Sequence, residues 1–335
     1  MRLLVTGGAG FIGSNLVHSL LPKPEVEKLV VLDSLTYAGH QLSLKGAQKF
    51  SKYSFSKVDL REPDSVSKLI NTEEITHVIH LAAESHVDRS ISDPGAFIET
   101  NVLGTFNLLE ACRILWEDNY SKCRFLHVST DEVFGSLGKT GVFSESSPYK
   151  PNSPYSASKA GADHLVRAYY HTYAFPGIIT NCSNNFGPYQ FPEKLIPQTI
   201  YRAASGKPIP VYGDGTNVRD WLYVMDHVEA LWLVLTSGKA GESYNIGADN
   251  EWPNLRLIEK ICDLVDSKLK RKIVTARELL TFVKDRQGHD FRYAIDACKI
   301  RRELGWKPTH KFESAMEMTV NWYLSNGDWL EAVTS

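Results

Sequence analysis

The sequence predicts an α/β protein in which a doubly wound parallel sheet carries a smaller, discontinuous α/β cap. Three observations lead to this fold class. The first half alternates short β-rich runs with longer helical patterns, the order that covers a parallel sheet on both faces. A glycine-rich turn joins the first run to the first helical pattern. After Asn181, Gly, Pro and aromatic residues become denser, as is typical of loop-rich surfaces that close over a ligand.

The elements of the first half follow from periodicity. Strands are short β-rich runs bounded by turn residues, and helices repeat their apolar positions every three to four residues. The predicted strands are residues 2–6, 28–33, 53–59, 77–82, 124–129 and 177–181. The predicted helices are residues 10–21, 63–71, 96–116 and 155–173. The sheet domain is expected over residues 1–180 and the cap mainly over 181–335, with segments near 218–247 and 290–305 returning to the sheet domain.

Composition narrows the class of protein. The chain has 335 residues, with 37 Lys plus Arg against 39 Asp plus Glu, and a formal net charge of −2. This balance gives no reason to expect nucleic acid or a membrane as partner. The cysteines form no CxxC pair and no His cluster has zinc spacing, so free thiols and no metal are expected. Without a signal peptide or a long apolar run, a soluble, cytoplasmic protein is predicted.

The glycine-rich turn indicates a dinucleotide site. Gly7, Gly10 and Gly13 follow the first strand and open the first helix, where the backbone can approach a pyrophosphate at the helix N-terminus. Asp33 ends the second strand, where a carboxylate accepts hydrogen bonds from both ribose hydroxyls and repels a 2′-phosphate. Residues 34–39 contain no Arg or Lys. The pattern predicts a Rossmann-type domain and favours NAD over NADP.

Later strand ends extend this site. Asp59 and Leu60 end the third strand, where a carboxylate could meet the adenine amino group. Leu81, Ala82 and Ala83 end the fourth strand with small residues, which would let the cofactor pass close to the backbone.

Two further motifs predict the chemistry. Residues 129–132 (STDE) end the fifth strand, and Tyr155 and Lys159 lie one turn apart on the following helix. There the ammonium is expected to lower the pKa of the phenol from about 10, which makes a base for an alcohol proton. Asp131 and Glu132 add a proton donor beside a proton acceptor. The set predicts oxidation of a sugar hydroxyl followed by elimination of water.

Together these features resemble the extended short-chain dehydrogenase/reductase superfamily and, within it, the dTDP-glucose 4,6-dehydratases. The likeness covers almost the full length. It rests on long segments: LAAESHVDRS at 81–90, ETNVLGT at 99–105, STDEVFG at 129–135, PYSASKAG at 154–161, TNCSNNFGPYQFPEKLIP at 180–197, RDWLY at 219–223 and DRQGHDFRY at 285–293.

The resemblance implies an NAD-dependent hydro-lyase that turns a nucleoside-diphosphate glucose into the 4-keto-6-deoxy sugar. It implies catalytic roles for Thr130, Asp131, Glu132, Tyr155 and Lys159. NAD would also lie near Phe11, Ile12, Asp33, Asp59, Leu60, Ser85, Thr100, Tyr155, Lys159 and Asn185. The sugar nucleotide would lie near Ser85, Thr130, Asn184, Lys194, Leu195, Pro210, Tyr212, Arg219, Asn254, Arg286 and His289. Of these, Lys194, Arg219 and Arg286 suit a diphosphate, and Tyr212 offers a face for a pyrimidine.

Some departures and alternatives stay open. Gln287 stands where the family usually has Pro, and residues 251–253 before Asn254 are atypical. A UDP-glucose 4,6-dehydratase would differ only in small contacts to the base and ribose. A nucleotide-sugar 4-epimerase would not need the Asp131–Glu132 pair, and a regulatory protein without turnover would not need Tyr155 and Lys159.

A homodimer is expected, built from the helices at 96–116 and 155–173 with Val166, Tyr169, Tyr170 and Tyr173 as a broad apolar-aromatic face.

Overall fold

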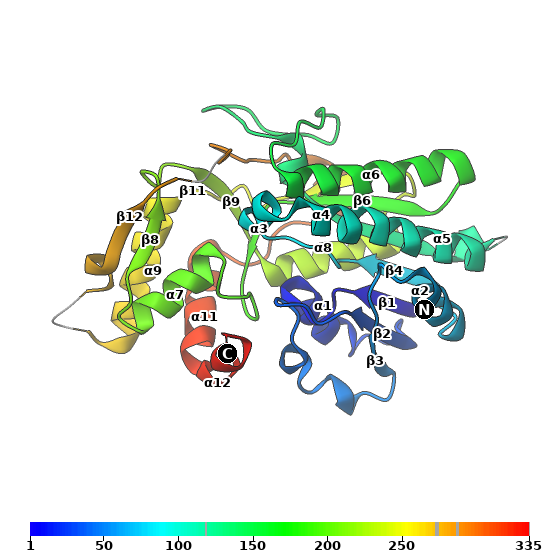
Figure 1. Cartoon of the computed structure of the whole chain (residues 1–335), viewed down its shortest axis with the longest axis horizontal. Helices are drawn as coiled ribbons and strands as arrows, with labels where there is room; N and C mark the ends of the chain where they lie inside the picture. The colour runs from blue at the N-terminus through cyan, green and yellow to red at the C-terminus, as the bar shows by residue number, and fades with distance from the viewer. Residues whose placement is uncertain (118, 272–274, 286–287, 335) are drawn as a thin grey trace.

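A seven-stranded parallel sheet forms the larger part of the molecule (Figure 1). The computed structural model describes residues 1–117, 119–271, 275–285 and 288–334. Along the sheet the strands are β10 (Ser243–Ile246), β6 (Gly177–Cys182), β5 (Arg124–Thr130), β4 (His77–His80), β1 (Arg2–Thr6), β2 (Lys28–Asp33) and β3 (Tyr53–Lys57). The strand order reverses between β1 and β4, because β2 and β3 lie on one side of β1 and the later strands on the other, and ligands bind at such a point in open α/β sheets.

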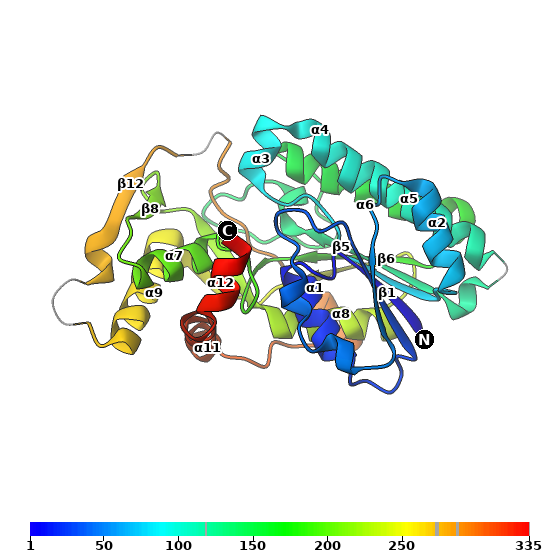
Figure 2. The ribbon, with the colours of Figure 1, turned by 60° about the horizontal axis from the view of Figure 1, so that its bottom comes forward.

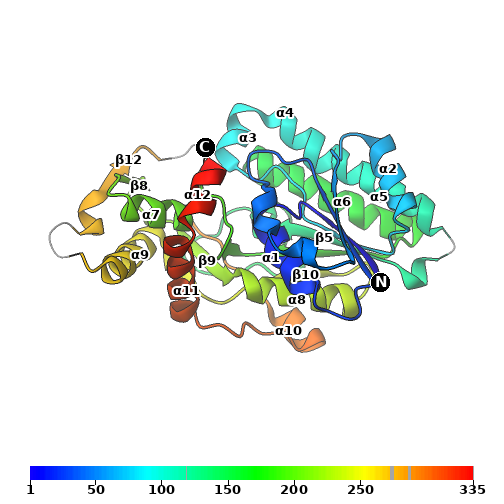
Figure 3. The same ribbon diagram turned by 90° about the horizontal axis from the view of Figure 1, so that it is seen from below.

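Alternating strand residues send apolar side chains to both faces of the sheet. Leu3 and Val5 pack in one core with α1 (Phe11–Leu20) and α8 (Val224–Ser237), whereas Leu4 packs in a second core with α2 (Pro63–Thr72), α5 (Gly104–Trp116) and α6 (Pro154–Tyr173). Figure 2 shows these two helix layers on opposite sides of the sheet. In Figure 3, α10 (Cys298–Leu304) lies beside α8, on the same side as α1.

A smaller lobe with its own core lies at one end of the sheet. Its helices are α7 (Leu195–Ala204), α9 (Asn254–Leu269), α11 (Phe312–Ser325) and α12 (Gly327–Thr334). A three-stranded sheet has the order β11 (Glu251–Pro253), β9 (Val218–Tyr223), β7 (Asn184–Phe186), and β8 (Ile209–Tyr212) pairs with β12 (Leu280–Val283). This lobe is built mainly from residues after 180, while β10 returns to the large sheet. The boundary at residue 180 stays a prediction.

The fold class predicted from the sequence is confirmed. The predicted strands at 53–59 and 77–82 were too long, because β3 ends at Lys57 and β4 at His80. The residues just beyond these strands, such as Asp59 and Ala82, line a cavity instead. Among the described residues, no helix is both long and apolar enough to cross a membrane.

The helix predicted at 96–116 is divided by a wide turn. It consists of α4 (Pro94–Phe97), a π-helix (Ile98–Leu103) and α5. Within the wide turn, Asn101 is buried, donates to the Glu84 carbonyl at 3.0 Å and to Ser158 Oγ at 2.8 Å, and accepts from the Glu84 amide at 2.8 Å. The π-helix therefore fixes the segment after β4, which α3 (Val87–Ser92) continues, against α6.

The expected apolar-aromatic face of α6 is only partly exposed. Val166 and Tyr169 are buried in the core against the sheet, whereas Tyr173 is exposed. The Tyr169 hydroxyl donates to Glu110 on α5 at 2.6 Å, which turns this side chain inward. The prediction that these side chains form one face for subunit contact was therefore wrong for Val166 and Tyr169.

Candidate active site

A cavity of about 580 Å³ lies at the carboxyl ends of β1, β4, β5 and β6, between the sheet and the smaller lobe. In parallel sheets this edge brings together loops from several strands, so residues far apart in sequence meet there. All the described residues of the predicted site line this cavity: Gly7, Gly10, Phe11, Ile12, Gly13, Asp33, Asp59, Leu60, Leu81, Ala82, Ala83, Ser85, Thr100, Thr130, Asp131, Glu132, Tyr155, Lys159, Asn184, Asn185, Lys194, Leu195, Pro210, Tyr212, Arg219, Asn254 and His289. Arg286 and Gln287 lie outside the described residues.

Close backbone packing explains two glycines of the first turn. Gly7 has a φ of +68°, and a Cβ on it would lie 2.7 Å from the Ala82 amide nitrogen. A Cβ on Gly13 would lie 2.1 Å from the Gly7 carbonyl oxygen. Both distances are too short for any side chain, so only glycine lets β1 turn directly into α1. The amino end of α1 consequently faces the cavity, where it can attract a pyrophosphate.

Asp33 closes the other side of this turn. Its carboxylate accepts from the Ala9 amide at 2.9 Å and the Leu35 amide at 2.8 Å. Burial raises the pKa of Asp33, and these two hydrogen bonds oppose the shift. A carboxyl with remaining acceptor positions at this strand end fits the ribose hydroxyls of a dinucleotide. The residues present therefore fit NAD, as the sequence predicts.

Asp131 has the environment of a neutral acid. It begins a short 3₁₀ turn (Asp131–Phe134) directly after β5, and its carboxyl is buried. Burial raises its pKa well above the usual range, and the charges of Glu132 and Asp220 add to the shift. Asp131 Oδ2 has no hydrogen-bond partner among the described residues. Because a buried polar atom rarely stays unsatisfied, this oxygen indicates where a ligand hydroxyl would bind.

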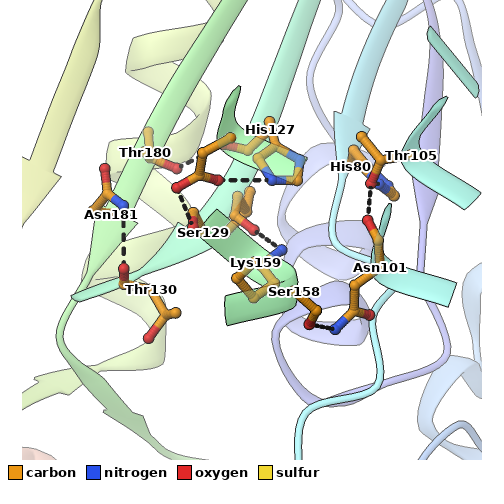
Figure 4. A network of polar contacts seen from close by, with 12 residues as sticks. His80, Asn101, Thr105, His127, Ser129, Thr130, Ser158, Lys159, Thr180 and Asn181 are labelled. Carbon is orange, nitrogen blue, oxygen red and sulfur yellow. Dashed lines mark hydrogen bonds and ion pairs between the residues drawn. The ribbon is translucent and has the colours of Figure 1, made fainter. Parts of the chain in front are cut away.

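Glu132 differs from its neighbour in exposure. It is half-buried, and its amide donates to Thr130 Oγ1 at 3.3 Å. The Thr130 hydroxyl thereby caps the 3₁₀ turn, and the Thr130 carbonyl accepts from Asn181 Nδ2 at 3.1 Å (Figure 4). Thr130, Asp131 and Glu132 are held as one rigid unit at the cavity, with one carboxyl buried and one in contact with solvent.

The expected effect of Lys159 on Tyr155 is not found in the chain by itself. Burial raises the pKa of the Tyr155 phenol well above 10, and the charge of Glu132 adds to the shift. Lys159 Nζ donates to the Val128 carbonyl at 2.9 Å, and burial lowers the pKa of its ammonium (Figure 4). The prediction of a lowered phenol pKa was therefore wrong for the protein alone. A phenolate at Tyr155 needs positive charge from a bound ligand.

The smaller lobe supplies polar groups to the opposite wall. Arg219 donates to the carbonyls of Val218 at 2.8 Å and Asp290 at 2.9 Å, and its guanidinium lies 4.3 Å from the centre of the Tyr293 ring. Lys194 Nζ donates to the Ser85 carbonyl at 2.9 Å. These contacts hold two cations at the cavity, where they suit an anionic ligand.

Two amide side chains also line the cavity on this wall. Asn184 Oδ1 and Asn254 Oδ1 are buried and, among the described residues, have no hydrogen-bond partner. The atypical segment before Asn254 has a structural reason, because Glu251 binds Arg292 through both carboxylate oxygens at 2.5 and 2.7 Å. This pair ties β11 to the segment that carries Tyr293.

Sequence reasoning missed a cluster near the cavity wall. The Arg89 guanidinium lies 3.6 Å from the centre of the Tyr37 ring, Phe191 contacts the same ring edge-on, and His86 lies 3.4 Å from Glu193. The cluster joins the segment after β2, the start of α3 and the loop before α7. Neither spacing nor residue type indicates this meeting, since the residues come from three segments that lie far apart in the sequence.

Cys182 and Tyr293 were also missed as cavity residues. Cys182 ends β6, so the rule that strand ends meet at one edge could have identified it. Tyr293 lies within the matched segment 285–293, but a buried aromatic is more often a core residue. In the part of the chain that is described, no group of three or more His, Cys, Asp or Glu side chains could hold a metal ion.

Comparisons with known proteins agree with this geometry. The dTDP-glucose 4,6-dehydratase of Salmonella typhimurium is 51% identical over 100% of this chain and 96% of its own. The solved structure of the dTDP-glucose 4,6-dehydratase DesIV from Streptomyces venezuelae, with NAD bound, is 44% identical, covers 99% of this chain and 100% of its own, and has a TM-score of 0.92. UDP-glucose 4-epimerase from Thermus thermophilus, solved with NAD, is 30% identical with a TM-score of 0.86, and the match covers 97% of this chain and 100% of the epimerase.

The family comparison covers nearly the whole chain. Residues 4–319 match the family described as GDP-mannose 4,6 dehydratase. The match includes every described residue of the predicted catalytic set and both walls of the cavity. The chain therefore belongs to the GDP-mannose 4,6 dehydratase family.

Proposed function

We propose that the protein is a dTDP-glucose 4,6-dehydratase, a hydro-lyase that uses NAD and converts dTDP-glucose to its 4-keto-6-deoxy form with loss of water. The observation that carries the proposal is the pair at the end of β5. Asp131 is buried, and burial together with the charge of neighbouring Glu132 raises its pKa well above the usual range, in the same cavity as Tyr155 and Lys159. An acid and a base side by side are what removal of water requires, and simple alcohol oxidation does not need both.

The first step is removal of the O4 proton. Tyr155, as phenolate, takes this proton while the Thr130 hydroxyl hydrogen-bonds the same oxygen. NAD, when bound, would supply the acceptor for the C4 hydride and, once reduced, the donor for C6, and its oxidised form would add positive charge to the site. Lys159, buried below Tyr155 on α6, is the cation that the chain itself contributes. Asp33, Thr100 and Asn185 would hold the cofactor.

The second step is elimination of water. The new C4 ketone acidifies the C5 proton, which Glu132 removes as the C6–O6 bond breaks. Asp131 gives its proton to O6, so that water rather than hydroxide leaves. Once hydride is back at C6, Glu132 returns a proton to C5. After these steps Tyr155 holds the proton from O4 and Asp131 has lost one, so one proton must pass from the phenol to the Asp131 carboxylate, directly or through solvent, before the next turnover.

The substrate and the hydride path are tested together. Purified protein with dTDP-glucose is expected to give a keto sugar that absorbs in alkali, and deuterium at C4 is expected in the C6 methyl group. Conversion of UDP-glucose in preference to dTDP-glucose would change the proposed substrate. Inversion at C4 without loss of water would instead make the protein a 4-epimerase. No change in either sugar would refute the enzymatic function.

We also propose that the enzyme is a homodimer in which the exposed apolar side chains near α5 contact a second copy. Ile98, Phe106 and Ile114 are 51%, 40% and 60% exposed, and Leu103 and Tyr173 lie on the same helical layer. Apolar residues in such number on one helix layer favour a self-complementary contact. The sequence expectation of a dimer through these two helical regions is retained, with Tyr173 as the contribution of α6.

Solution mass at micromolar concentration tests this dimer. The protein is expected at roughly twice 37.6 kDa. Phe106→Glu combined with Ile114→Glu is expected to give a folded monomer, because two charges would be buried at the contact. Phe282→Glu, an equally apolar and exposed position on β12, should leave the dimer intact. A monomeric wild-type protein would contradict the proposal.

The enzyme is proposed to act in the cytoplasm. All five cysteines, four of them buried and Cys298 exposed, are free thiols. Free thiols suit a reducing compartment.

A further inference from the structure

We propose that Asp163 is a positioning residue for the reaction: it fixes the end of β5 against α6 and supplies the counter-charge that keeps Lys159 a cation. The inference rests on the proposed function, since it concerns how Tyr155 and Lys159 are presented to the substrate. Asp163 is not among the residues lining the cavity, so it acts through others and does not touch the reacting atoms.

The carboxyl of Asp163 joins three segments of the fold. It lies one turn after Lys159 on α6 and is only 1% exposed. Oδ2 accepts from Ser129 Oγ at 2.8 Å and from the Tyr149 hydroxyl at 2.9 Å. Oδ1 lies 3.1 Å from His127 Nε2. A carboxylate with almost no access to water is costly to bury, so its presence here calls for a reason beyond packing.

The contacts fall on the strand that carries the catalytic acids. His127 and Ser129 alternate along β5 and point to the same side, toward α6 (Figure 4). Between them, the Val128 carbonyl accepts from Lys159. Two consecutive turns of α6 therefore hydrogen-bond Val128 and Ser129 of β5, and the Asp163 carboxyl also lies against His127. Since Thr130 follows directly, this attachment sets the distance between Tyr155 on the helix and the acids after the strand.

The charge of Asp163 has a second effect. Lys159 is buried, and burial lowers the pKa of its ammonium, while the charge of Asp163 raises it. Cys182 on β6 also faces Lys159, but burial raises the pKa of its thiol to about 12, so it carries no charge near pH 7. His80 on β4 and His127 on β5 also face this region, but burial lowers the pKa of both imidazoles, so both are neutral near pH 7. Asp163 is thus the carboxylate that stabilises the buried cation.

Asp163 can provide this charge at neutral pH. Burial raises its pKa to about 6, and the Lys159 ammonium and the hydrogen bonds from Ser129 and Tyr149 oppose a larger rise. The group is therefore mostly ionised above pH 6 and protonated below it. Among its neighbours, Tyr149 is neutral, because burial raises the pKa of that phenol.

The test removes the charge and keeps the shape. Asp163→Asn retains an acceptor for Ser129 but no negative charge. In the full-length, NAD-loaded enzyme, the Lys159 ammonium is then expected to titrate about one pH unit lower, because an opposite charge has gone. Lysine ¹³Cε NMR measures this directly, with the Lys159 signal assigned by its loss in Lys159→Arg. The rate constant for keto-sugar formation should fall about tenfold at neutral pH with little change in KM, and the alkaline limb of its pH profile should move to lower pH.

Asp226→Asn is the matched control. Asp226 on α8 is equally buried, accepts from the Thr309 amide at 3.0 Å and the Thr309 hydroxyl at 2.8 Å, and is not a cavity residue. It is expected to lower the unfolding temperature while the Lys159 titration and the pH profile stay unchanged. If Asp163→Asn behaves like Asp226→Asn, the role of Asp163 is merely structural and the proposal is wrong.

A second variant covers the case in which Asp163→Asn does not fold. Tyr149→Phe removes one hydrogen bond to the carboxylate, so the pKa of Asp163 should rise and the acid limb of the activity profile should move to higher pH. An unmoved acid limb would overturn the proposal. The NMR titration also separates the two conclusions. A shifted Lys159 signal in a protein that forms no keto sugar would refute the proposed function and leave the role of Asp163 intact.

Discussion

Replacing Glu132 by Gln is expected to stop loss of water while C4 oxidation continues. Glutamine has the size of glutamate but cannot accept the C5 proton. Product formation should fall by about a hundred- to ten-thousandfold, the usual contribution of a positioned base. With a substrate deuterated at C5, the label should stay in place, and a transient absorbance of NADH at 340 nm should still form.

The same variant has a pH signature. Glu132 is the second-largest cause of the raised Tyr155 pKa, after burial. Removing a negative charge favours the phenolate, so the pKa of Tyr155 should fall and the transient NADH signal should persist to lower pH than in the wild type. Glu145→Gln is the control, because Glu145 accepts from the Asn245 amide at 2.9 Å outside the cavity. Continued C5 exchange and product formation in Glu132→Gln would show that another group is the base.

Replacing Tyr155 by Phe is expected to abolish the reaction at its first step. Without a phenol no group of the chain takes the O4 proton, so neither the NADH transient nor the keto sugar should appear above about a thousandth of the wild-type rate. The ring contact with Phe97, at 6.3 Å between centroids, needs no hydroxyl, so the fold should be unchanged. Single-turnover absorbance at 340 nm together with alkaline detection of keto sugar measures both.

Comparison of the two variants tests the order of steps. Glu132→Gln should accumulate the oxidised intermediate, and Tyr155→Phe should not. A Tyr155→Phe enzyme with an undiminished 340 nm transient would assign the first proton transfer elsewhere. Phe97→Leu, which changes the neighbour of the ring and keeps the hydroxyl, is the control for repacking.

Much of the fold follows from local pattern. The strands at 2–6 and 28–33 contain short, continuous apolar runs, and the predicted positions of these strands and of the helix at 155–173 agree with β1, β2 and α6 to within a residue. The cavity residues at 130–132 could be placed because carboxyl ends of parallel strands share one edge. The cap resisted prediction, since its short strands pair across long sequence distances that no local pattern encodes.

Electrostatics of the site could not be derived from spacing. Tyr155 and Lys159 do lie one turn apart, but the acceptor of the ammonium is the Val128 carbonyl, on a strand 31 positions away in sequence. The sequence shows which groups are charged, whereas their desolvation depends on the packed structure. For the same reason Asp163 looks like an ordinary helix residue until the strand it contacts is known.

The π-helix (Ile98–Leu103) determines how the residues of α5 are rotated about the helix axis relative to the residues before it. Thr100 faces the cavity from within the wide turn, while Ile114 lies on the outer surface of α5 beyond it. If the same residues wound as an ordinary α-helix without the wide turn, all of α5 would be rotated by roughly 100° relative to Thr100. Ile114 would leave its outward position and the buried residue Leu108 would lose its place over the sheet. The extra residue in the π-helix thus lets one continuous helical segment place Thr100 at the cavity and Ile114 on the outer surface.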